Sequence, residues 1–483
     1  MRVLAIDQGT TNTKALVVDE AGTILARASA PSTSSYPKPG WAEQSAEAIW
    51  AATRRVIDAV AAEVGPDSID ALAISNQRET IVAWDAETGE PVGPAILWQC
   101  TRTAEICAAL VAAGHGPAVT AATGLAINPM FPAPKMAWIV ENRPKARALH
   151  QTGRLRMGTV DAWLLWNLTA GAAFATDHSN ASRTQLFDTA QLAWSPALGA
   201  LFGAPVDCLP DPRPSDARFG ETAAGATALP AGIPIHAMMG DSHAALYGHG
   251  VRAPGVVKAT YGTGSSLMTL TPARVASTHG VSGTIAWSDR TGTQYALEGN
   301  IFVSAQAAAF MGKLLGIGDA RALSDLAQTV DDAGGVTFVP ALSGLGAPHW
   351  DERATGTIAG MTHATTPAHL ARATFEAITL QIVDVFEAME ADIGTPLAAL
   401  SADGGASANP FLMQLQADLL GHPVLRSEVE EVGALGAAAM AFEALGANPD
   451  WHRDSTRFDP AMDRGARENL RTRWAEAMRH VKA

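Results

Sequence analysis

Residues 3–20 read VLAIDQGTTNTKALVVDE, where a short apolar run ends at Asp7 and a polar turn leads into a second apolar run. This order predicts a strand, a tight turn and a second strand. The turn QGTTNT contains small hydroxyl side chains and accessible backbone N–H groups, which are able to hold phosphate oxygens. Asp7 offers a carboxylate to the magnesium ion that accompanies a nucleotide. An ordinary β-hairpin fits the same letters, because Gly, Thr and Asn are common in turns.

The same pattern recurs in the second half of the chain. Residues 256–272 read VVKATYGTGSSLMTLTP, again a strand, a Gly/Thr turn and a strand. Just before them, in GIPIHAMMGDSHAALYGHG (232–250), an apolar strand ends at Asp241 and small residues follow. We interpret the recurrence as an internal duplication, in which two facing hairpins hold a polyphosphate from both sides. Residues 400–421 predict a strand, a glycine-rich turn and a helix, a further place for a nucleotide against a helix N-terminus.

The segments between these hairpins alternate strand and helix patterns. Residues 40–64 show helical spacing of apolar side chains, and residues 69–92 predict a strand, a loop and a second strand. Helical patterns follow around residues 103–113 and 134–142, so we expect a mixed sheet covered by helices. The spaced apolar residues of the first helical pattern are Trp41, Ile49, Val56, Ile57 and Val60.

The C-terminal part of the chain contains two more helical patterns. Residues 362–392 predict a long amphipathic helix. One face of this helix is formed by Leu370, Thr374, Ile378, Ile382 and Phe386. The tail from about residue 449 is polar with a helical end, and we expect it to be an appendage.

Length, charge and cysteine content limit the classes of protein. At 483 residues the chain is too long for one hydrophobic core, so we expect at least two domains. A net charge of −14 without runs of Lys or Arg predicts no nucleic-acid partner and no membrane partner. The three cysteines, Cys100, Cys107 and Cys208, form neither a disulfide framework nor a zinc pattern. The N-terminus does not resemble a signal peptide, so we expect a cytoplasmic protein.

Missing motifs exclude several enzyme classes. No GxxxxGK[ST] stretch of a Walker-type loop is present, and no GxGxxG follows a strand and opens a helix, as a dinucleotide-binding dehydrogenase requires. Ser242 is adjacent to His243, but no GxSxG elbow of a serine hydrolase exists.

Several longer stretches carry a resemblance to known proteins. They are MFPAPKMAWIVEN (130–142), GTIAGMTHATTPAHLARATFE (356–376), SNQRETIVAWDAETGEP, ILWQCTRTAEIC, GTVDAWLLWNLT, SNASRTQLFD, GLGAPHWD and DGGASANPFLMQLQADLLG. The first two are similar to the two signatures of the FGGY family of carbohydrate kinases, with His369, Ala373 and Glu376 at the spacing of the second. The chain resembles this family over about residues 1–480, and the glycerol kinases within it most.

The resemblance implies an α/β fold of two duplicated ribonuclease-H-like domains, of the actin, hexokinase and Hsp70 type, with an interdomain cleft. We expect an N-terminal domain over residues 1–247, which holds substrate and the first phosphate hairpin. A nucleotide-binding C-terminal domain with a helical tail would cover residues 248–483. Family members transfer the γ-phosphoryl group of ATP, with Mg2+, to a hydroxyl of a sugar or polyol. ATP, Mg2+ and a small polyol or sugar are therefore the expected ligands, and a homo-oligomer is left open.

The resemblance also assigns roles around the phosphate acceptor. Asp241 matches the catalytic aspartate, which takes the proton from the attacking hydroxyl, although such an Asp also often caps a helix. Arg78 and Glu79 match a pair that binds substrate hydroxyls, and a donor fork beside a carboxylate suits a vicinal diol. The alternative for this pair is a solvated surface ion pair. Trp98 matches a wall of the pocket, with a buried core tryptophan as the alternative.

The nucleotide-binding positions implied by the resemblance fall on three turns. They are Thr10, Thr11, Asn12 and Lys14 in the first hairpin, Gly262 and Thr263 in the second, and Gly405 and Asn409 in the glycine-rich turn. Lys14 stands where glycerol kinases carry Arg, so a point charge replaces a bidentate fork. A Gly and a Gln that contact nucleotide in glycerol kinases fall at about Ala305 and Ala309, which alters the details of nucleotide binding.

The expected acceptor pocket departs from that of glycerol kinases at three positions. A pocket Tyr falls at Met130, a Gln becomes Ser242, and a Phe becomes Ser266. Lost bulk and a lost hydroxyl weaken the fit of a three-carbon triol, so we expect a four- or five-carbon polyol or ketose. Glycerol kinase activity is the alternative. A non-catalytic ATP-binding sensor of the same fold is less favoured, because it needs neither Asp241 nor the Arg78–Glu79 pair.

Overall fold

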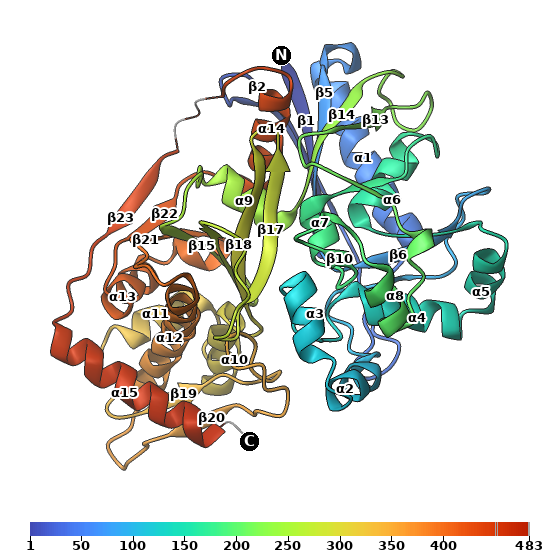
Figure 1. Cartoon of the computed structure of the whole chain (residues 1–483). Helices are drawn as coiled ribbons and strands as arrows, with labels where there is room; N and C mark the ends of the chain where they lie inside the picture. The colour runs from blue at the N-terminus through green and yellow to red at the C-terminus, as the bar shows by residue number, and fades with distance from the viewer. Residues whose placement is uncertain (450, 452, 482–483) are drawn as a thin grey trace. The chain divides into compact units, whose positions relative to one another are not determined.

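The computed structural model describes residues 1–449, 451 and 453–481, and the chain divides into two compact units (Figure 1). The first unit comprises Met1–Gly250, Gly283–Tyr295 and Glu431–His452. The second comprises Val251–Ser282, Ala296–Glu430 and Arg453–Ala483. Each unit therefore combines separate stretches of the chain, and a domain boundary after residue 247 stays a prediction.

The first unit is built on a mixed sheet. Its strands are β1 (Arg2–Gln8), β2 (Asn12–Asp19), β3 (Ile24–Pro31), β5 (Ala71–Asn76), β13 (Arg218–Glu221) and β14 (Pro234–Gly240), in the order β13-β14-β5-β1-β2-β3. β1 pairs antiparallel with β2, which confirms the hairpin predicted from residues 3–20, and parallel with β5. The register places Asp7 between Lys14 on β2 and Ser75 on β5.

Helices pack on both faces of this sheet (Figure 1). α1 (Ala46–Val64) and α6 (Val160–Leu168) cover the face that carries Leu4 and form a buried apolar core with it. Side chains alternate along a strand, so Asp7 belongs to the other face. There α14 (Val432–Ala444) packs against β1, β5 and β14.

The helix predicted from residues 40–64 is confirmed as α1, but it begins later than the apolar pattern indicates. Ser45 caps it, because its side chain accepts a hydrogen bond from the N–H of Ala48 at 3.0 Å. Trp41 precedes this cap, and its ring packs edge-on against Trp138. Trp41 is therefore not part of the helix face.

A second sheet in the first unit carries its own apolar core. Its strands are β4 (Glu43–Gln44), β6 (Ile81–Asp85), β7 (Ala95–Ile96) and β8 (Leu155–Thr159), in the order β4-β7-β6-β8. The helices of this region are α2 (Ala104–Ala112), α3 (Gly116–Thr123), α4 (Pro132–Asn142), α5 (Pro144–Gln151) and α8 (Pro196–Phe202). The remaining elements of the first unit are η1 (Pro66–Ser68), β9 (Ala175–Asp177), α7 (His178–Ser182), β10 (Phe187–Asp188), β11 (Ala193–Trp194), η2 (Val206–Cys208), β12 (Asp211–Arg213), α9 (Asp241–Gly248) and β17 (Ser282–Asp289).

The second unit repeats the strand arrangement of the first. Its strands β15 (Val256–Tyr261), β16 (Ser265–Thr271), β18 (Gly292–Ile301), β21 (Ala399–Asp403), β22 (Val424–Ser427) and β23 (Ser455–Phe458) follow the order β18-β16-β15-β21-β22-β23. β15 pairs antiparallel with β16 and parallel with β21, as β1 does with β2 and β5. The predicted duplication of the hairpin is therefore confirmed, and each of the six strands of the first sheet has a counterpart at the same place in this order.

The long helix predicted for residues 362–392 is confirmed as α12 (Pro367–Ile393). Thr374, Ile378, Ile382 and Phe386 of the predicted face are buried, and Leu370 is partly buried. The other elements of the second unit are α10 (Ala305–Leu315), α11 (Ala320–Ala327), β19 (Thr337–Val339), β20 (Thr357–Ala359), η3 (Gly405–Ala408) and α13 (Pro410–Leu420).

The C-terminal helix α15 (Arg464–Val481) is not an appendage, which corrects the expectation from its polar composition. Trp474 and Met478 are 3% and 4% exposed and belong to the core of the second unit. Arg471 donates hydrogen bonds to the carbonyls at the end of α13. Residues 450, 452 and 482–483 of the predicted tail lie outside the described residues.

Among the described residues, no single helix is both long and apolar enough to cross a membrane. α2 and α3 together meet the criteria of length and composition, but the chain bends by 106° between them.

Candidate active site

Acidic side chains gather where β1 and β14 end in the first unit. Asp7 Oδ1 accepts a hydrogen bond of 2.8 Å from the hydroxyl of Ser75. Burial raises the pKa of Asp7 to about 6, and the charges of Asp241 and Glu431 contribute to the rise. Repulsion among carboxylates is relieved by a cation. The donors are all oxygens, the kind that Mg2+ prefers, so these residues fit Mg2+.

Lys14 is held by a residue far away in the sequence. Its Nζ donates to both carboxylate oxygens of Glu431, at 2.9 and 2.7 Å. Glu431 has a φ of 60° and directly precedes α14. A Cβ added to Gly433 would lie 3.9 Å from Asp7 Oδ1, so the first turn of α14 lies beside the end of β1. α14 was not predicted to be part of this region, because its Ala-rich sequence is typical of a packing helix.

The turn of the first hairpin is tied to Trp98. The indole Nε1 donates to the hydroxyl of Thr10 at 3.0 Å, and that hydroxyl donates to Gln77 at 3.1 Å. Thr11 and Asn12 are exposed at the tip of the turn. The structure thus brings Trp98 to the predicted phosphate hairpin, a contact that the separation of 88 residues did not reveal.

Asp241 stands at the junction of β14 and α9. Its Oδ1 accepts a hydrogen bond of 2.9 Å from Arg78 Nε and one of 2.6 Å from the N–H of Ser242. The terminal guanidinium nitrogen Nη2 of Arg78 also donates to Ser242 Oγ at 3.1 Å. The Asp241 side chain is 42% exposed, whereas that of Arg78 is 7% exposed. A buried guanidinium thus holds a carboxylate that remains accessible to a ligand.

Glu79 adjoins this pair and is held by a second arginine. Arg183 Nε donates to Glu79 Oε1 at 2.7 Å, and Arg78 Nη1 lies 3.9 Å from the same oxygen. Glu79 has a φ of 58°, which is unusual for a residue with a side chain. Both Arg78 and Glu79 are buried, so the alternative of a solvated surface pair is wrong. Arg183 was not predicted as a site residue, although it lies in the motif SNASRTQLFD.

A buried polar network supports the backbone that carries Asp241. The Ser179 hydroxyl accepts a hydrogen bond of 3.0 Å from the N–H of Gly240, the residue before Asp241. Asp177 accepts hydrogen bonds from Ser179 and from Asn180. Burial raises the pKa of Asp177. This network was not predicted, because Asp177 and Gly240 lie on separate strands.

The residues predicted for nucleotide binding in the second unit lie on neighbouring turns. The carbonyls of Gly262 and Thr263 accept hydrogen bonds from the first residues of α10. A Cβ added to Gly404 would approach Tyr261 O to 2.6 Å, so the glycine-rich turn lies against the end of β15. Gly405 has open space around its Cα, whereas the Asn409 side chain caps α13.

Ser266 and Met130 are placed in different units. Ser266, on β16 of the second unit, donates to Glu298 at 3.4 Å. Met130 is 8% exposed in the first unit and precedes α4. Their assignment to one acceptor pocket stays a prediction.

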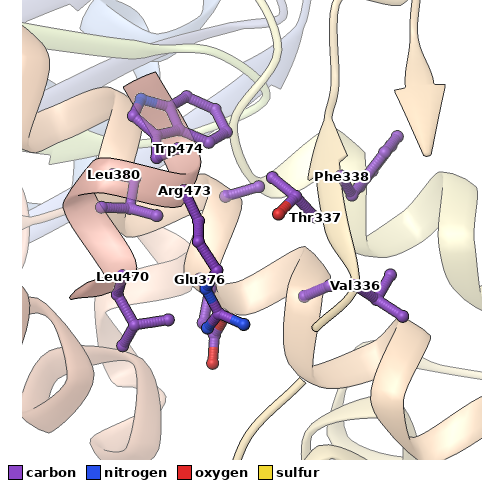
Figure 2. A pocket seen from close by; sticks show the side chains of 10 residues that line it. Val336, Thr337, Phe338, Glu376, Leu380, Leu470, Arg473 and Trp474 are labelled. Carbon is purple, nitrogen blue, oxygen red and sulfur yellow. The ribbon is translucent and has the colours of Figure 1, made fainter. Parts of the chain in front are cut away.

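A small cavity lies in the second unit, away from these predicted residues (Figure 2). Its volume of about 10 Å3 leaves room for roughly one water molecule. It is lined by parts of β19, α12 and α15, with Glu376 and Arg473 among its polar residues. Glu376 accepts a hydrogen bond from Arg372 at 3.0 Å, and burial raises its pKa. This signature residue is therefore buried and paired with a residue on its own helix.

The two sheets of matching strand order define an α/β protein of the ribonuclease-H-like class. The N-terminal domain of the FGGY family of carbohydrate kinases matches residues 2–248, and the C-terminal domain of that family matches residues 257–445. The chain belongs to the FGGY family of carbohydrate kinases. It is therefore a phosphotransferase with an alcohol group as acceptor, and ATP is the donor that the family implies.

Curated relatives and solved structures agree with this assignment. The chain is 46% identical to an apulose kinase of Pectobacterium atrosepticum over 92% of this chain and 90% of that protein. It is 45% identical to a glycerol kinase of Symbiobacterium thermophilum over 99% and 98%. The Plasmodium falciparum glycerol kinase with ADP has a TM-score of 0.93 at 31% identity, covering 99% of this chain and 98% of that one. The xylulose kinase of Lactobacillus acidophilus shares the fold, with a TM-score of 0.90 at 21% identity over 99% and 98%.

Proposed function

We propose that this chain transfers the γ-phosphoryl group of ATP to a hydroxyl of a four- or five-carbon polyol or ketose. The observation that carries the proposal is the Asp241 carboxylate, which is 42% exposed and held by the buried Arg78. A fixed and accessible carboxylate is what a general base requires. A sensor of nucleotide has no need of it.

In the proposed reaction, Asp241 accepts the proton of the acceptor hydroxyl. The oxygen then forms a bond to the γ-phosphorus while the bond between that phosphorus and the β-bridging oxygen breaks, so ADP leaves. Arg78 donates to hydroxyl oxygens of the acceptor, and Glu79 accepts from its hydroxyl groups. Asp7 would hold Mg2+, which supplies positive charge to the phosphate oxygens.

Lys14 and the turns of both units would contact the nucleotide. Thr11 and Asn12 are exposed at the hairpin turn and Thr10 beside them is half-buried, an arrangement that suits phosphate oxygens. In the second unit, Gly262 and Thr263 lie on the turn that contacts the start of α10. Gly405 is the first residue of η3, and open space there allows close approach of a ligand. The Asn409 side chain would act indirectly, by capping α13.

The size of the acceptor is inferred from the altered pocket positions. Met130, Ser242 and Ser266 replace larger or hydroxyl-bearing residues of glycerol kinases, and unfilled space lowers affinity for a three-carbon substrate. The relative named as an apulose kinase supports a ketose acceptor. Glycerol is the second candidate, because a relative named as a glycerol kinase is 45% identical over 99% of this chain.

Kinetics with a panel of acceptors test the proposal. We expect kcat/KM for the best of apulose, xylulose, ribulose and erythritol to exceed that for glycerol by about 10–200-fold, the usual effect of a missing methylene contact. The double variant Met130→Tyr with Ser242→Gln should shift this ratio toward glycerol. A wild-type enzyme that prefers glycerol over every four- and five-carbon acceptor overturns the proposed size. Absence of transfer to any acceptor overturns the kinase assignment of this site.

A further inference from the structure

Lys135 is a fully buried lysine in the first turn of α4. Its Nζ donates to four backbone carbonyls, those of Met130 at 2.6 Å, Leu97 at 2.9 Å, and Glu79 and Trp98 at 3.3 Å. A single ammonium group therefore binds four carbonyl oxygens. These come from three separate stretches of the chain.

The three stretches are those that carry the expected acceptor residues of the first unit. Glu79 lies on the loop between β5 and β6, Trp98 follows β7, and Met130 precedes α4. Their side chains are the ones assigned above to substrate hydroxyls, the pocket wall and the altered pocket position. The ammonium group therefore links the backbones of three expected pocket residues at one point.

The stability of the fold does not require a buried charge at this position. Transfer of an ammonium into a low-dielectric interior costs several kcal/mol unless hydrogen bonds compensate, and an apolar side chain avoids that cost. A buried charge with four carbonyl partners, in contrast, fixes the relative positions of its partners. The neighbouring α4 residues Pro132, Ala133 and Met136 are buried and apolar, so Lys135 is the charged exception on this turn.

We propose that Lys135 is a positioning residue of the acceptor site, which sets the relative positions of Glu79, Trp98 and Met130 without touching the substrate. The kinetic part of this inference rests on the proposed function, because it assumes that these residues bind the acceptor. Loss of the ammonium should weaken binding of the acceptor and leave ATP binding nearly unchanged.

The pH dependence of acceptor binding gives a signature that a merely structural residue lacks. The groups facing the ammonium are the Glu79 carboxylate, the Arg102 guanidinium and the thiols of Cys100 and Cys107. Burial lowers the pKa of Lys135 to about 7. The ammonium has three N–H donors, whereas the neutral amine has two donors and a lone pair that repels carbonyl oxygens. We therefore expect the acceptor KM to rise as the pH increases through about 7, with a much smaller change in the KM for ATP.

The variant Lys135→Met tests the proposal, since it removes charge and donors at nearly constant volume. We expect a rise of about tenfold or more in acceptor KM, a change below about twofold in the KM for ATP, and loss of the rise in acceptor KM near pH 7. The matched control is Lys145→Met, an exposed lysine on α5 that pairs with Glu90. It should leave both KM values and the pH profile unchanged. An unchanged acceptor KM in Lys135→Met, or equal changes in both KM values, overturns the proposal.

Two further measurements test the same proposal: the pH profile of the wild type and hydrogen exchange on the variant. If Lys135→Met does not fold, the pH profile of the wild type decides, because an acceptor KM that is flat through pH 7 contradicts the proposal. Hydrogen exchange of the backbone amides, measured on Lys135→Met, tests the positioning role without any substrate. Exchange should become faster in residues 77–80, 96–100 and 128–132, with residues 256–271 unchanged as the reference. If the wild type phosphorylates no acceptor, the proposed function fails, and the exchange measurement alone decides whether Lys135 positions these stretches.

Discussion

Two glutamates of the candidate site adopt backbone conformations that normally favour glycine. Glu79 has a φ of 58° and Glu431 a φ of 60°. Such conformations cost about 1–3 kcal/mol each and persist where surrounding contacts determine them. The Arg183 guanidinium holds Glu79, and the Lys14 ammonium holds Glu431. Each cation thus fixes the direction of a carboxylate beside Asp241 or Asp7.

The first prediction at the scale of single residues concerns Asp241. Asp241→Asn should lower kcat by about 10²–10⁴-fold, because the amide cannot accept the proton of the acceptor hydroxyl. ATP binding, measured by calorimetry, should remain close to that of the wild type. The control is Asp67→Asn, an exposed position in η1. Turnover of Asp241→Asn within a few-fold of the wild type would remove Asp241 from the role of base.

Asp7 provides the second prediction. Asp7→Asn keeps the shape of the side chain but removes the charge expected to hold Mg2+, so the Mg2+ concentration needed for half-maximal rate should increase. A titration of rate against Mg2+ at saturating ATP measures the effect. Ser75→Ala is the matched control, because it removes only the hydrogen bond to Asp7 Oδ1. Identical titrations for Asp7→Asn and the wild type would show that Asp7 is only a turn residue.

At the scale of elements, the closest packing near the site is the crossing of α9 and α14. A Cβ added to Gly436 would lie 1.9 Å from the carbonyl oxygen of Ala244, and one added to Gly248 would lie 2.1 Å from that of Val432. Both contacts involve backbone atoms, which cannot move aside as a side chain does. α9 begins with Asp241, and α14 directly follows Glu431. The crossing of the two helices therefore links the backbone positions of these two acidic residues.

The third prediction follows from this crossing. Gly436→Val should reduce the free energy of unfolding by about 1–3 kcal/mol or more, because the added atoms overlap the backbone of α9. Chemical denaturation measures the loss. Gly116→Ala, in the first turn of α3, is the control, because a Cβ there meets nothing within 4 Å. Equal stability of Gly436→Val and the wild type would contradict the tight crossing.

At the scale of the whole molecule, buried acids make stability depend on pH. Asp161 is fully buried in the first turn of α6, and its carboxylate accepts hydrogen bonds from Thr159 and Thr176. Burial raises the pKa of Asp161 to about 6, and the charge of Asp177 adds to the rise. The folded state therefore binds the proton more tightly than the unfolded state, whose Asp pKa is about 3.9.

The fourth prediction concerns this pH dependence. The contribution of Asp161 should become more stabilising as the pH falls from 7 through about 6 toward 4, since a raised acid pKa favours the protonated folded state. We expect the stability difference between the wild type and Asp161→Asn to shift in favour of the wild type over this range. Thermal unfolding at pH 7, 5.5 and 4 measures it, with Asp67→Asn as the pH-insensitive comparison. A constant difference across the range would contradict the raised pKa.

A cytoplasmic location stays a prediction for the whole molecule, and the oligomeric state stays open. The four- or five-carbon acceptor is a proposal. The family, the phosphotransferase activity and the α/β fold, in contrast, are established by matches over residues 2–248 and 257–445 and by whole-chain relatives.

Local pattern by itself determined the two hairpins, α1, α12 and the strand that leads to Asp241, because strand and helix periodicity are properties of neighbouring residues. Composition misled where burial is decided by distant partners, as for the polar C-terminal helix whose Trp474 enters the core. Only the tertiary structure placed Glu431 on Lys14, Arg183 on Glu79 and Lys135 under four carbonyls. The first two pairs lie 417 and 104 positions apart in the sequence. Such pairings form only when distant parts of the chain fold together, so a short stretch of sequence does not reveal them.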